Sequence, residues 1–261
     1  MYERRRGTKH SSLKQKPLRR PGQSLQREMD RLLGDKFLPI VVFAAIIGIL
    51  TLYEWERVVF NLPPHPYWMT GLALPTIGYC VYKYFALRKQ LERLRLGRDG
   101  ERIVGQFLEH LRSQGCLVFH DIIGDGFNID HVVVSPRGIY AIETKTYSKP
   151  TRGQAVAQFD GERLLVNGIE HERDGVQQVK ALSRWLRDQL QETTGRRFPI
   201  RGVVLLPEWY VEFQTKEKTD VWVLNPKLLP SFIEREPVVL KPEDIALISS
   251  RITKFMQTDE Q

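Results

Sequence analysis

Three ionisable residues lie in an apolar stretch of this sequence, with the types and spacing that metal-assisted chemistry requires. From Phe127 to Lys145 the chain reads FNIDHVVVSPRGIYAIETK, and Asp130, Glu143 and Lys145 interrupt or end two runs rich in Val and Ile. Such groups are seldom buried unless they are paired or bind a metal. Carboxylate oxygens are hard ligands that suit Mg²⁺ or Mn²⁺, and a neighbouring ammonium group offsets their negative charge.

A β-hairpin would bring these residues together. The Ser135–Gly138 segment is a turn signal between two runs that read as central strands, and Glu143 and Lys145 share a strand face. A two-residue turn places Asp130 directly across from Glu143, with Cβ atoms about 4.5–5.5 Å apart. A three-residue loop with Gly138 in a bulge would slip the register and turn Asp130 away, unless a second bulge re-aimed it. Both registers are open from the sequence.

The charge of the chain is concentrated at its beginning. Residues 1–36 hold eleven Lys and Arg against four acids, and residues 88–98 hold five bases and one acid. Because the net charge is +8, the remainder is slightly negative and is not itself a basic nucleic-acid-binding surface. The two cysteines, Cys80 and Cys116, exclude a disulfide framework and a cysteine-type zinc site.

Two apolar segments follow the basic tail. Residues 37–53 are uncharged, and residues 67–87 form a second apolar run that contains Pro75 and Lys83. Aromatic residues and prolines cluster in the short link, whereas bases precede the first run and follow the second. The positive-inside rule therefore predicts a membrane hairpin with both chain termini in the cytoplasm, and the alternative is a pair of buried core helices.

The elements that follow alternate between helical and extended patterns. A helix is expected from about residue 87 to 114, with Glu101 beside its apolar stripe and Gly97 or Gly100 as the points where it would break. Strands are expected at 116–119, around the hairpin, and at 202–206 and 221–224. Further helices are expected at 175–194, 227–234 and 242–256. This order indicates an α/β domain.

The hairpin string, preceded by GRDGERIVGQFL and followed by a helix containing GVQQV, resembles the nuclease-related domain (NERD) family over roughly residues 95–207. That family is a suspected branch of the PD-(D/E)xK nucleases. The resemblance implies a restriction-endonuclease-like core, a mixed central sheet flanked by helices, here preceded by a two-helix transmembrane hairpin. The expected parts are a largely disordered basic tail (1–36), the hairpin (37–87, with spans at about 37–54 and 67–87), the nuclease-like domain (88–207) and C-terminal elements that pack on it (208–261).

The resemblance also implies roles for individual residues. Asp130 and Glu143 match the family's paired carboxylates, Lys145 matches its catalytic lysine, and Glu101 matches a supporting acid on the preceding helix. Together the three acids would bind Mg²⁺ or Mn²⁺. Gln178 matches the glutamine of the following helix, with Gln177 as the alternative. Where many members have Asn-Pro before this helix, the present chain has Asp174-Gly175.

Less specific interpretations accompany each of these features. A Glu and a Lys two apart on a strand usually form a solvated ion pair. His131 is expected to pack as a strand residue, His120 and His171 to be exposed, and Gly124-Asp125-Gly126 to be a turn.

The sequence thus predicts a membrane-anchored, metal-dependent nuclease that acts on DNA or RNA at the cytoplasmic side. The alternatives are a catalytically silent nucleic-acid-binding or scaffolding module and an envelope protein whose basic tail binds anionic lipid.

Overall fold

The computed structural model covers the whole chain, and the residues that it describes are 19–60, 62, 66–124, 126–150, 153–170, 175–215 and 218–258. The first half of the basic tail (residues 1–18), together with His171, Asp174 and Asp125, lies outside the described residues. The predictions made for them therefore stay predictions.

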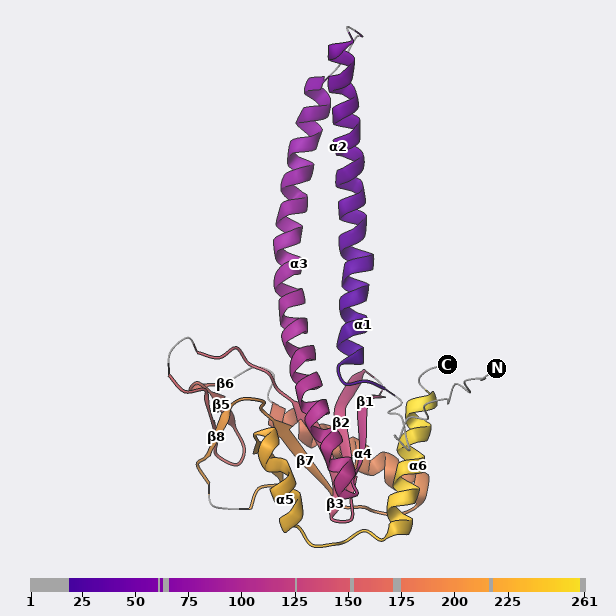
Figure 1. Ribbon diagram of the computed structural model, residues 1–261, viewed down its shortest axis with the longest axis vertical. Helices are drawn as coiled ribbons and strands as arrows, with labels where there is room; N and C mark the ends of the chain where they lie inside the picture. Colours follow the sequence, from indigo (N-terminus) through magenta and orange to yellow (C-terminus); the bar gives the residue numbers. More distant parts are fainter. Residues whose placement is uncertain are drawn as a thin grey trace, which may run out of the picture.

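Two long antiparallel helices project from a compact α/β domain (Figure 1). The first is continuous from α1 (Gln23–Arg31) through a π-helical segment (Leu32–Phe37) into α2 (Leu38–Val59), and the second is α3 (Pro66–Glu109). α3 passes through Gly97 and Gly100 without the break expected there, and it contains Pro75. A single helix therefore links the second apolar segment to the α/β domain.

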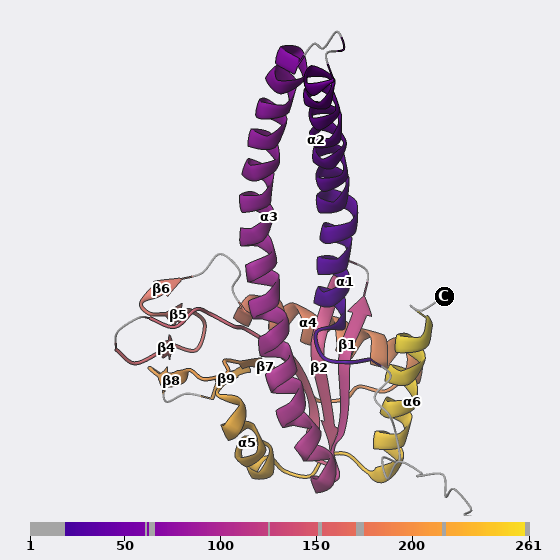
Figure 2. The same ribbon diagram turned by 45° about the horizontal axis from the view of Figure 1, so that its top comes forward.

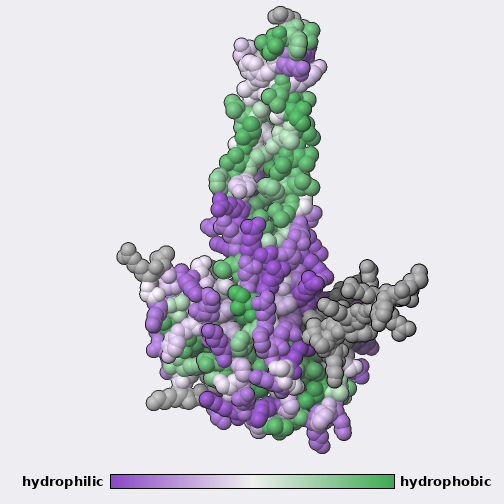
Figure 3. Space-filling view, viewed as in Figure 1, coloured by the Kyte–Doolittle hydropathy of each residue, from purple (hydrophilic) through white to green (hydrophobic). Residues whose placement is uncertain are grey.

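The outer part of this helix pair exposes apolar side chains on both members, seen as a green band in Figure 3. Within the described residues, however, only the run Gln23–Val59 is long and apolar enough to cross a membrane, with a mean hydropathy of 2.2 and 6% of its apolar window buried. The second predicted span, residues 67–87, does not qualify by composition, because Pro75, Lys83 and several tyrosines lower its hydropathy. The structure thus supports one candidate span and not the two that were predicted.

The α/β domain is built on a five-stranded mixed sheet with strand order β1-β2-β3-β7-β9 (Figure 2). The first three strands are antiparallel, whereas β3, β7 and β9 are parallel. Their bounds are β1 Leu117–Gly124, β2 Phe127–Ser135, β3 Gly138–Thr144, β7 Ile200–Leu205 and β9 Val221–Leu224. A smaller sheet has the order β6-β5-β4-β8, formed by β4 Val156–Phe159, β5 Leu164–Val166, β6 Ile169–Glu170 and β8 Tyr210–Phe213.

Helices cover both faces of the main sheet, which confirms the predicted α/β class. On one face α4 (Gly175–Thr194) and α6 (Pro242–Thr258) close a core of alternating strand side chains. On the other face the end of α3 and α5 (Leu229–Arg235) close a second core. Short 3₁₀ turns at His110–Gln114 and Pro226–Leu228 end α3 and begin α5. The N-terminal half of α4 also packs on the smaller sheet.

The hairpin between β2 and β3 has the two-residue turn. Ser135 pairs with Gly138, and the same register runs as far as His131 and Ile142, one residue short of Asp130 and Glu143. Gly138 has φ 144°, which favours glycine, but it closes the turn and does not form a bulge that slips the strands. The three-residue alternative is therefore wrong.

β1 and β2 nevertheless change face at one matched position, Asp121 in β1 and Asp130 in β2. Along β1, Val118 lies in the core beneath α3, but Ile122 lies in the core beneath α4, although strict alternation would put both on one face. Ile129 of β2 shares the second core with Ile122, and pairing resumes in the same register on both sides. Asp121 accommodates the change with φ 56°, a conformation that aspartate tolerates better than most residues. This irregularity aims Asp130 out of the regular ladder.

Candidate active site

The five predicted site residues come from four elements that meet at the carboxyl end of β3. Glu143 lies at the end of β3 with Lys145 just beyond it, and Asp130 lies opposite on β2. Glu101 belongs to α3, and Gln178 lies in the first turn of α4. Each of the acids is under 10% exposed, so they form a buried acidic group and not a solvated surface pair.

Lys145 is held between two of these residues. Its Nζ lies 3.0 Å from Glu143 Oε1 and donates a hydrogen bond of 2.7 Å to Gln178 Oε1. The side chains of Lys145 and Glu143 are 15% and 5% exposed, so the ion pair is shielded from water. The solvated-pair interpretation is therefore wrong for this site. Gln178, and not the alternative Gln177, contacts the lysine.

The start of α4 approaches Lys145 closely because residue 175 has no side chain. A Cβ at Gly175 would lie 3.0 Å from Lys145 Cγ and 3.3 Å from Val204 Cγ1. The glycine that replaces the proline expected from the family pattern thus leaves room for the lysine stem. It also lets the first turn of α4 bring Gln178 within hydrogen-bonding distance of the amine.

Asp130 is committed to the backbone of β3. Its Oδ2 accepts a 2.7 Å hydrogen bond from the amide of Thr144, between Glu143 and Lys145 in the sequence. This bond fixes the carboxylate at the point where the β2–β3 ladder ends. The sequence predicted the position of Asp130 opposite Glu143 but gave no sign of this amide bond.

Burial raises the pKa of all three acids. The pKa of Glu101 is raised to about 8, by loss of hydration and by the like charges of Asp121 and Glu143, although a hydrogen bond from the Gly22 backbone and Lys145 oppose the rise. Burial and the same crowding raise the pKa of Asp130, and burial raises that of Glu143 against the opposing charge of Lys145. Three carboxylates with one lysine cannot all carry charge here without a further cation.

The donor chemistry of the site fits a hard divalent cation better than its geometry does. One carboxylate oxygen of Glu101 and one of Glu143 are buried without a hydrogen-bond partner, and both are ligand types that Mg²⁺ or Mn²⁺ prefers. In the described part of the chain, however, no group of three or more His, Cys, Asp or Glu side chains is close enough to hold an ion. The acids thus supply suitable oxygen ligands, but these ligands are not close enough together to bind one ion.

A segment that the sequence assigned to the disordered tail is ordered against this site. The Arg19 guanidinium is 1% exposed and donates to the carbonyl oxygens of Asp121 at 3.1 Å and Met256 at 3.2 Å. The amide of Ser24 donates to Asp121 Oδ2 at 3.0 Å, and Gly22 bonds to Glu101. The tail over residues 1–36, predicted to be largely disordered, is therefore ordered from Arg19 onward. No local sequence signal marks these long-range contacts.

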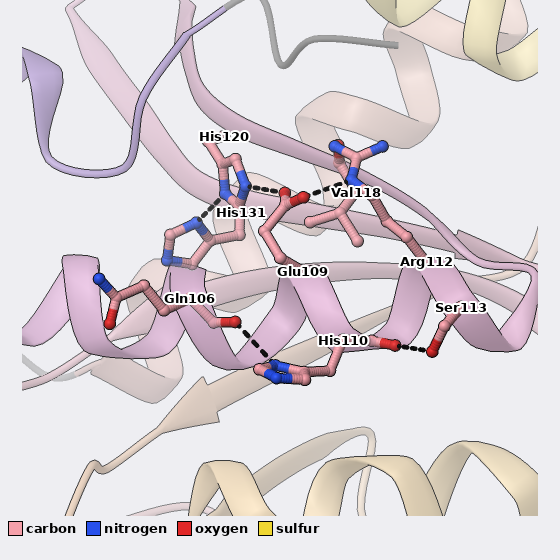
Figure 4. A network of polar contacts seen from close by, with 8 residues as sticks. All are labelled: Gln106, Glu109, His110, Arg112, Ser113, Val118, His120 and His131. Atoms are coloured by element: carbon pink, nitrogen blue, oxygen red, sulfur yellow. Dashed lines mark hydrogen bonds and ion pairs between the residues drawn. The ribbon is translucent and has the colours of Figure 1, made fainter. Parts of the chain in front are cut away.

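A buried histidine pair lies behind the site, on the sheet face that α3 covers (Figure 4). His120 Nδ1 is 2.9 Å from His131 Nδ1, and His120 Nε2 is 2.7 Å from Glu109 Oε1. His131 packs as a strand residue, as predicted, but His120 is 1% exposed, so its expected exposure is wrong. Burial lowers the pKa of both imidazoles. Extending the first strand beyond 119 would have revealed this cross-strand pair.

Three comparisons with known proteins bear on this region. An uncharacterized protein of Bacillus anthracis is 34% identical over 56 residues, which cover 20% of this chain and about a quarter (26%) of that protein. No solved structure matches the chain. The family model of the nuclease-related domain (NERD) matches residues 96–207, a region that contains all five of the predicted site residues.

Proposed function

We propose that this protein is a membrane-anchored, metal-dependent nuclease that hydrolyses phosphodiester bonds of nucleic acid at the cytoplasmic side, with a site of the PD-(D/E)xK type. One observation carries the proposal. Within the nuclease-related domain, the Lys145 amine is held by Glu143 and Gln178 beside two further buried acids. A structural ion pair would not need buried ionisable and polar side chains from four elements.

The residues would share the chemistry as follows. Asp130 and Glu143 would hold Mg²⁺ or Mn²⁺, and Glu101 would complete the shell directly or through water. When bound, the metal would lower the pKa of a water molecule and neutralise charge on the phosphate. Lys145 would orient the attacking water and stabilise the developing negative charge. Gln178 positions the Lys145 amine.

The membrane anchor is supported by the apolar band on both projecting helices. Large apolar side chains are exposed along α2 and also along the first half of α3, where they include Leu72, Ile77 and Phe85. We propose that the two helices insert as a pair, because α3 lies alongside α2 and would share its environment. Arg88, Lys89 and the bases that follow would then mark the cytoplasmic boundary. The anionic-lipid role of the basic tail stays a prediction.

The nuclease proposal is tested on the full-length chain in detergent. The protein is offered single- and double-stranded DNA and RNA with Mg²⁺ or Mn²⁺, beside Glu143→Gln and Lys145→Met. Each variant should lower the cleavage rate by about 10²–10³, the usual cost of one such electrostatic contact. Glu192→Gln removes an exposed carboxylate on α4 and should leave the rate unchanged. Absence of cleavage by the wild type with either metal and all substrates would contradict the proposal.

A catalytically silent nucleic-acid-binding or scaffolding module is the second candidate. Two observations favour it: one Asp130 oxygen is committed to Thr144, and no three ligands converge in the described part of the chain. This candidate predicts that nucleic acid is retained on a gel but not cut. Binding should then be the same in wild type and in Glu143→Gln, with and without divalent metal.

A further inference from the structure

A cavity of about 690 Å³ lies on the flank of α4 that faces away from the candidate active site. Its lining includes the beginnings of three parallel strands, Gly138 of β3, Ile200 of β7 and Val221 of β9. Glu143 and Lys145 lie at the opposite, carboxyl end of β3. The helix thus separates the two regions, with Gln178 on the side of the acids and Gln177 lining the cavity.

The cavity is strongly basic. Among the described residues, five basic side chains line it against two acidic ones, Asp220 and Glu236. The bases are Arg137, Lys180, Arg184, Arg187 and Arg201. Because the remainder of the chain outside its N-terminal and juxtamembrane stretches is slightly negative, this concentration of positive charge is local and is not a general property of the domain.

Neutral backbone groups hold most of these arginines, so their charge is not cancelled. Arg187 donates to the carbonyl of Ile200 at 3.3 Å, and Arg137 donates to the carbonyl of Glu236. Arg201 donates to a carbonyl at 3.0 Å and makes the one ion pair, with Glu236 at 3.6 Å. Among the described residues, Lys180, Arg184 and Arg187 pair with no carboxylate. Carbonyl contacts therefore orient the guanidinium groups and leave them electropositive.

Ser183 gives the cavity a polar floor. Its side chain is 95% buried (5% exposed), and its Oγ has no hydrogen-bond partner. A Cβ at Gly202 would approach this hydroxyl to 3.0 Å, so the glycine of β7 leaves room for the Ser183 side chain. A buried hydroxyl without a partner is costly unless a ligand or water satisfies it.

We propose that this cavity binds a phosphate-bearing ligand, either a free nucleotide or a segment of nucleic-acid backbone, at a site separate from the acids. Guanidinium groups match phosphate oxygens in pairs, and Ser183 adds a hydroxyl donor. The volume is in the range of small-ligand sites. Lys180, Arg184 and Arg187 follow one face of α4 over about 10 Å, roughly three nucleotide steps along one strand.

The place of the cavity argues against a lipid phosphate. Gly100 of α3 lies against Thr146, just beyond the carboxyl end of β3. Leu111, which follows the end of α3, shares a core with Tyr140, near the beginning of β3. The start of β3 therefore lies farther from the apolar helix pair than the acids do. A bilayer around α2 and α3 would be at the opposite end of the domain.

The proposal does not depend on hydrolysis and is tested without divalent metal. Full-length protein in detergent and EDTA is titrated with inorganic phosphate, AMP and a fluorescent 12-nucleotide single strand. Lys180→Ala/Arg184→Ala should weaken binding of at least one probe tenfold or more, and Ser183→Ala several-fold. Lys89→Ala/Arg93→Ala removes the same two charges at the same helical spacing on α3 and should leave affinity within twofold.

Each outcome decides something. Loss of AMP binding in the cavity variant identifies a free nucleotide as the ligand, whereas loss confined to the strand identifies nucleic-acid backbone. Equal weakening in the α3 control shows only general charge attraction and overturns the proposal. So does unchanged affinity in the cavity variant with an unchanged thermal melt, or a wild type that binds none of the three probes. Intact cleavage activity in the cavity variant would not count as support for the proposed phosphate site.

Discussion

At the scale of single residues, the chemistry of the site depends on how four side chains limit each other's charge. Glu101, Asp130 and Glu143 lose hydration together, and among the described residues Lys145 is the cation held beside them. The apolar residues of the hairpin shield these carboxylates from water, and the two-residue turn brings the strands that carry Asp130 and Glu143 together. A raised carboxyl pKa is thus a direct consequence of the sequence around Asp130 and Glu143.

This arrangement predicts a stability that falls as pH rises. The pKa of Glu101 is about 8 in the folded chain, above its usual value of 4.5, so the folded state binds more protons between these values. In EDTA, the free energy of unfolding should therefore decrease from about pH 5 to about pH 8. Glu101→Gln should flatten this decrease, and Glu192→Gln should not. Thermal melts across this pH range measure it, and an unchanged slope in Glu101→Gln would contradict it.

The residue types of the site could be predicted because buried ionisable groups are rare in strands. The register of the hairpin, which ends one residue before Asp130 and Glu143, followed from counting across a two-residue turn. The amide bond from Thr144 to Asp130 and the burial of His120 could not be predicted. Both depend on the change of face at Asp121 and Asp130, which no composition or spacing signals.

At the scale of elements, α4 and the N-terminal segment position the acids from two sides. α4 brings Gln178 to Lys145, and its bounds, Gly175–Thr194, are those that the periodicity predicted. The segment from Arg19 to Ser24 was missed because its composition is that of a disordered tail. Its order comes from contacts made about a hundred residues away in the sequence, with Asp121 and beyond.

The close approach of α4 predicts the effect of one added methyl group. Gly175→Ala would place a Cβ about 3.0 Å from Lys145 Cγ, so the lysine stem must shift away from Gln178. We expect cleavage to fall about tenfold, in line with a loss of positioning, while strand binding in EDTA stays the same. Gly78→Ala, on a helix surface with no atom within 4 Å, is the control. Full activity in Gly175→Ala would show that this contact does not position the amine.

The N-terminal segment predicts a second element-scale effect. Arg19→Ala leaves the buried carbonyls of Asp121 and Met256 without their donor, which should cost about 1–3 kcal/mol. It should also release the Gly22 contact with Glu101 and speed tryptic cleavage within α1. Arg27→Ala removes an exposed arginine of α1 and should change the melt little. Equal melting temperatures for the two variants would contradict the structural role of Arg19.

At the scale of the whole molecule, the chain divides into an apolar helix pair and an α/β domain whose acids and basic cavity lie on opposite flanks of α4. The sequence itself shows the basic residues that flank the two apolar segments and the aromatic residues in the link between them. The second span stays a proposal, because an apolar run interrupted by Pro75, Lys83 and tyrosines has modest hydropathy and is not itself a candidate span. The basic cavity was not predicted, since its residues come from separate strands and one helix face.

The number of spans predicts where the two chain ends lie. If α2 and α3 both cross the membrane, reporters fused before Met1 and after Gln261 should both read cytoplasmic. If only α2 crosses, the two reporters should read from opposite sides. Reporter activity in intact cells distinguishes the two arrangements, and an external reading at the C-terminus would defeat the proposed hairpin.

The unbroken course of α3 has a consequence for which molecules the candidate active site can meet. From Leu87 to Glu101 the helix rises about 21 Å, at about 1.5 Å per residue, with no hinge or linker in between. An inserted α3 would thus act as a rigid spacer that fixes both the distance and the orientation of the acids relative to the lipid headgroups. Such a protein would not reach molecules deep in the cell interior, and it would act on molecules that come within a few nanometres of the bilayer.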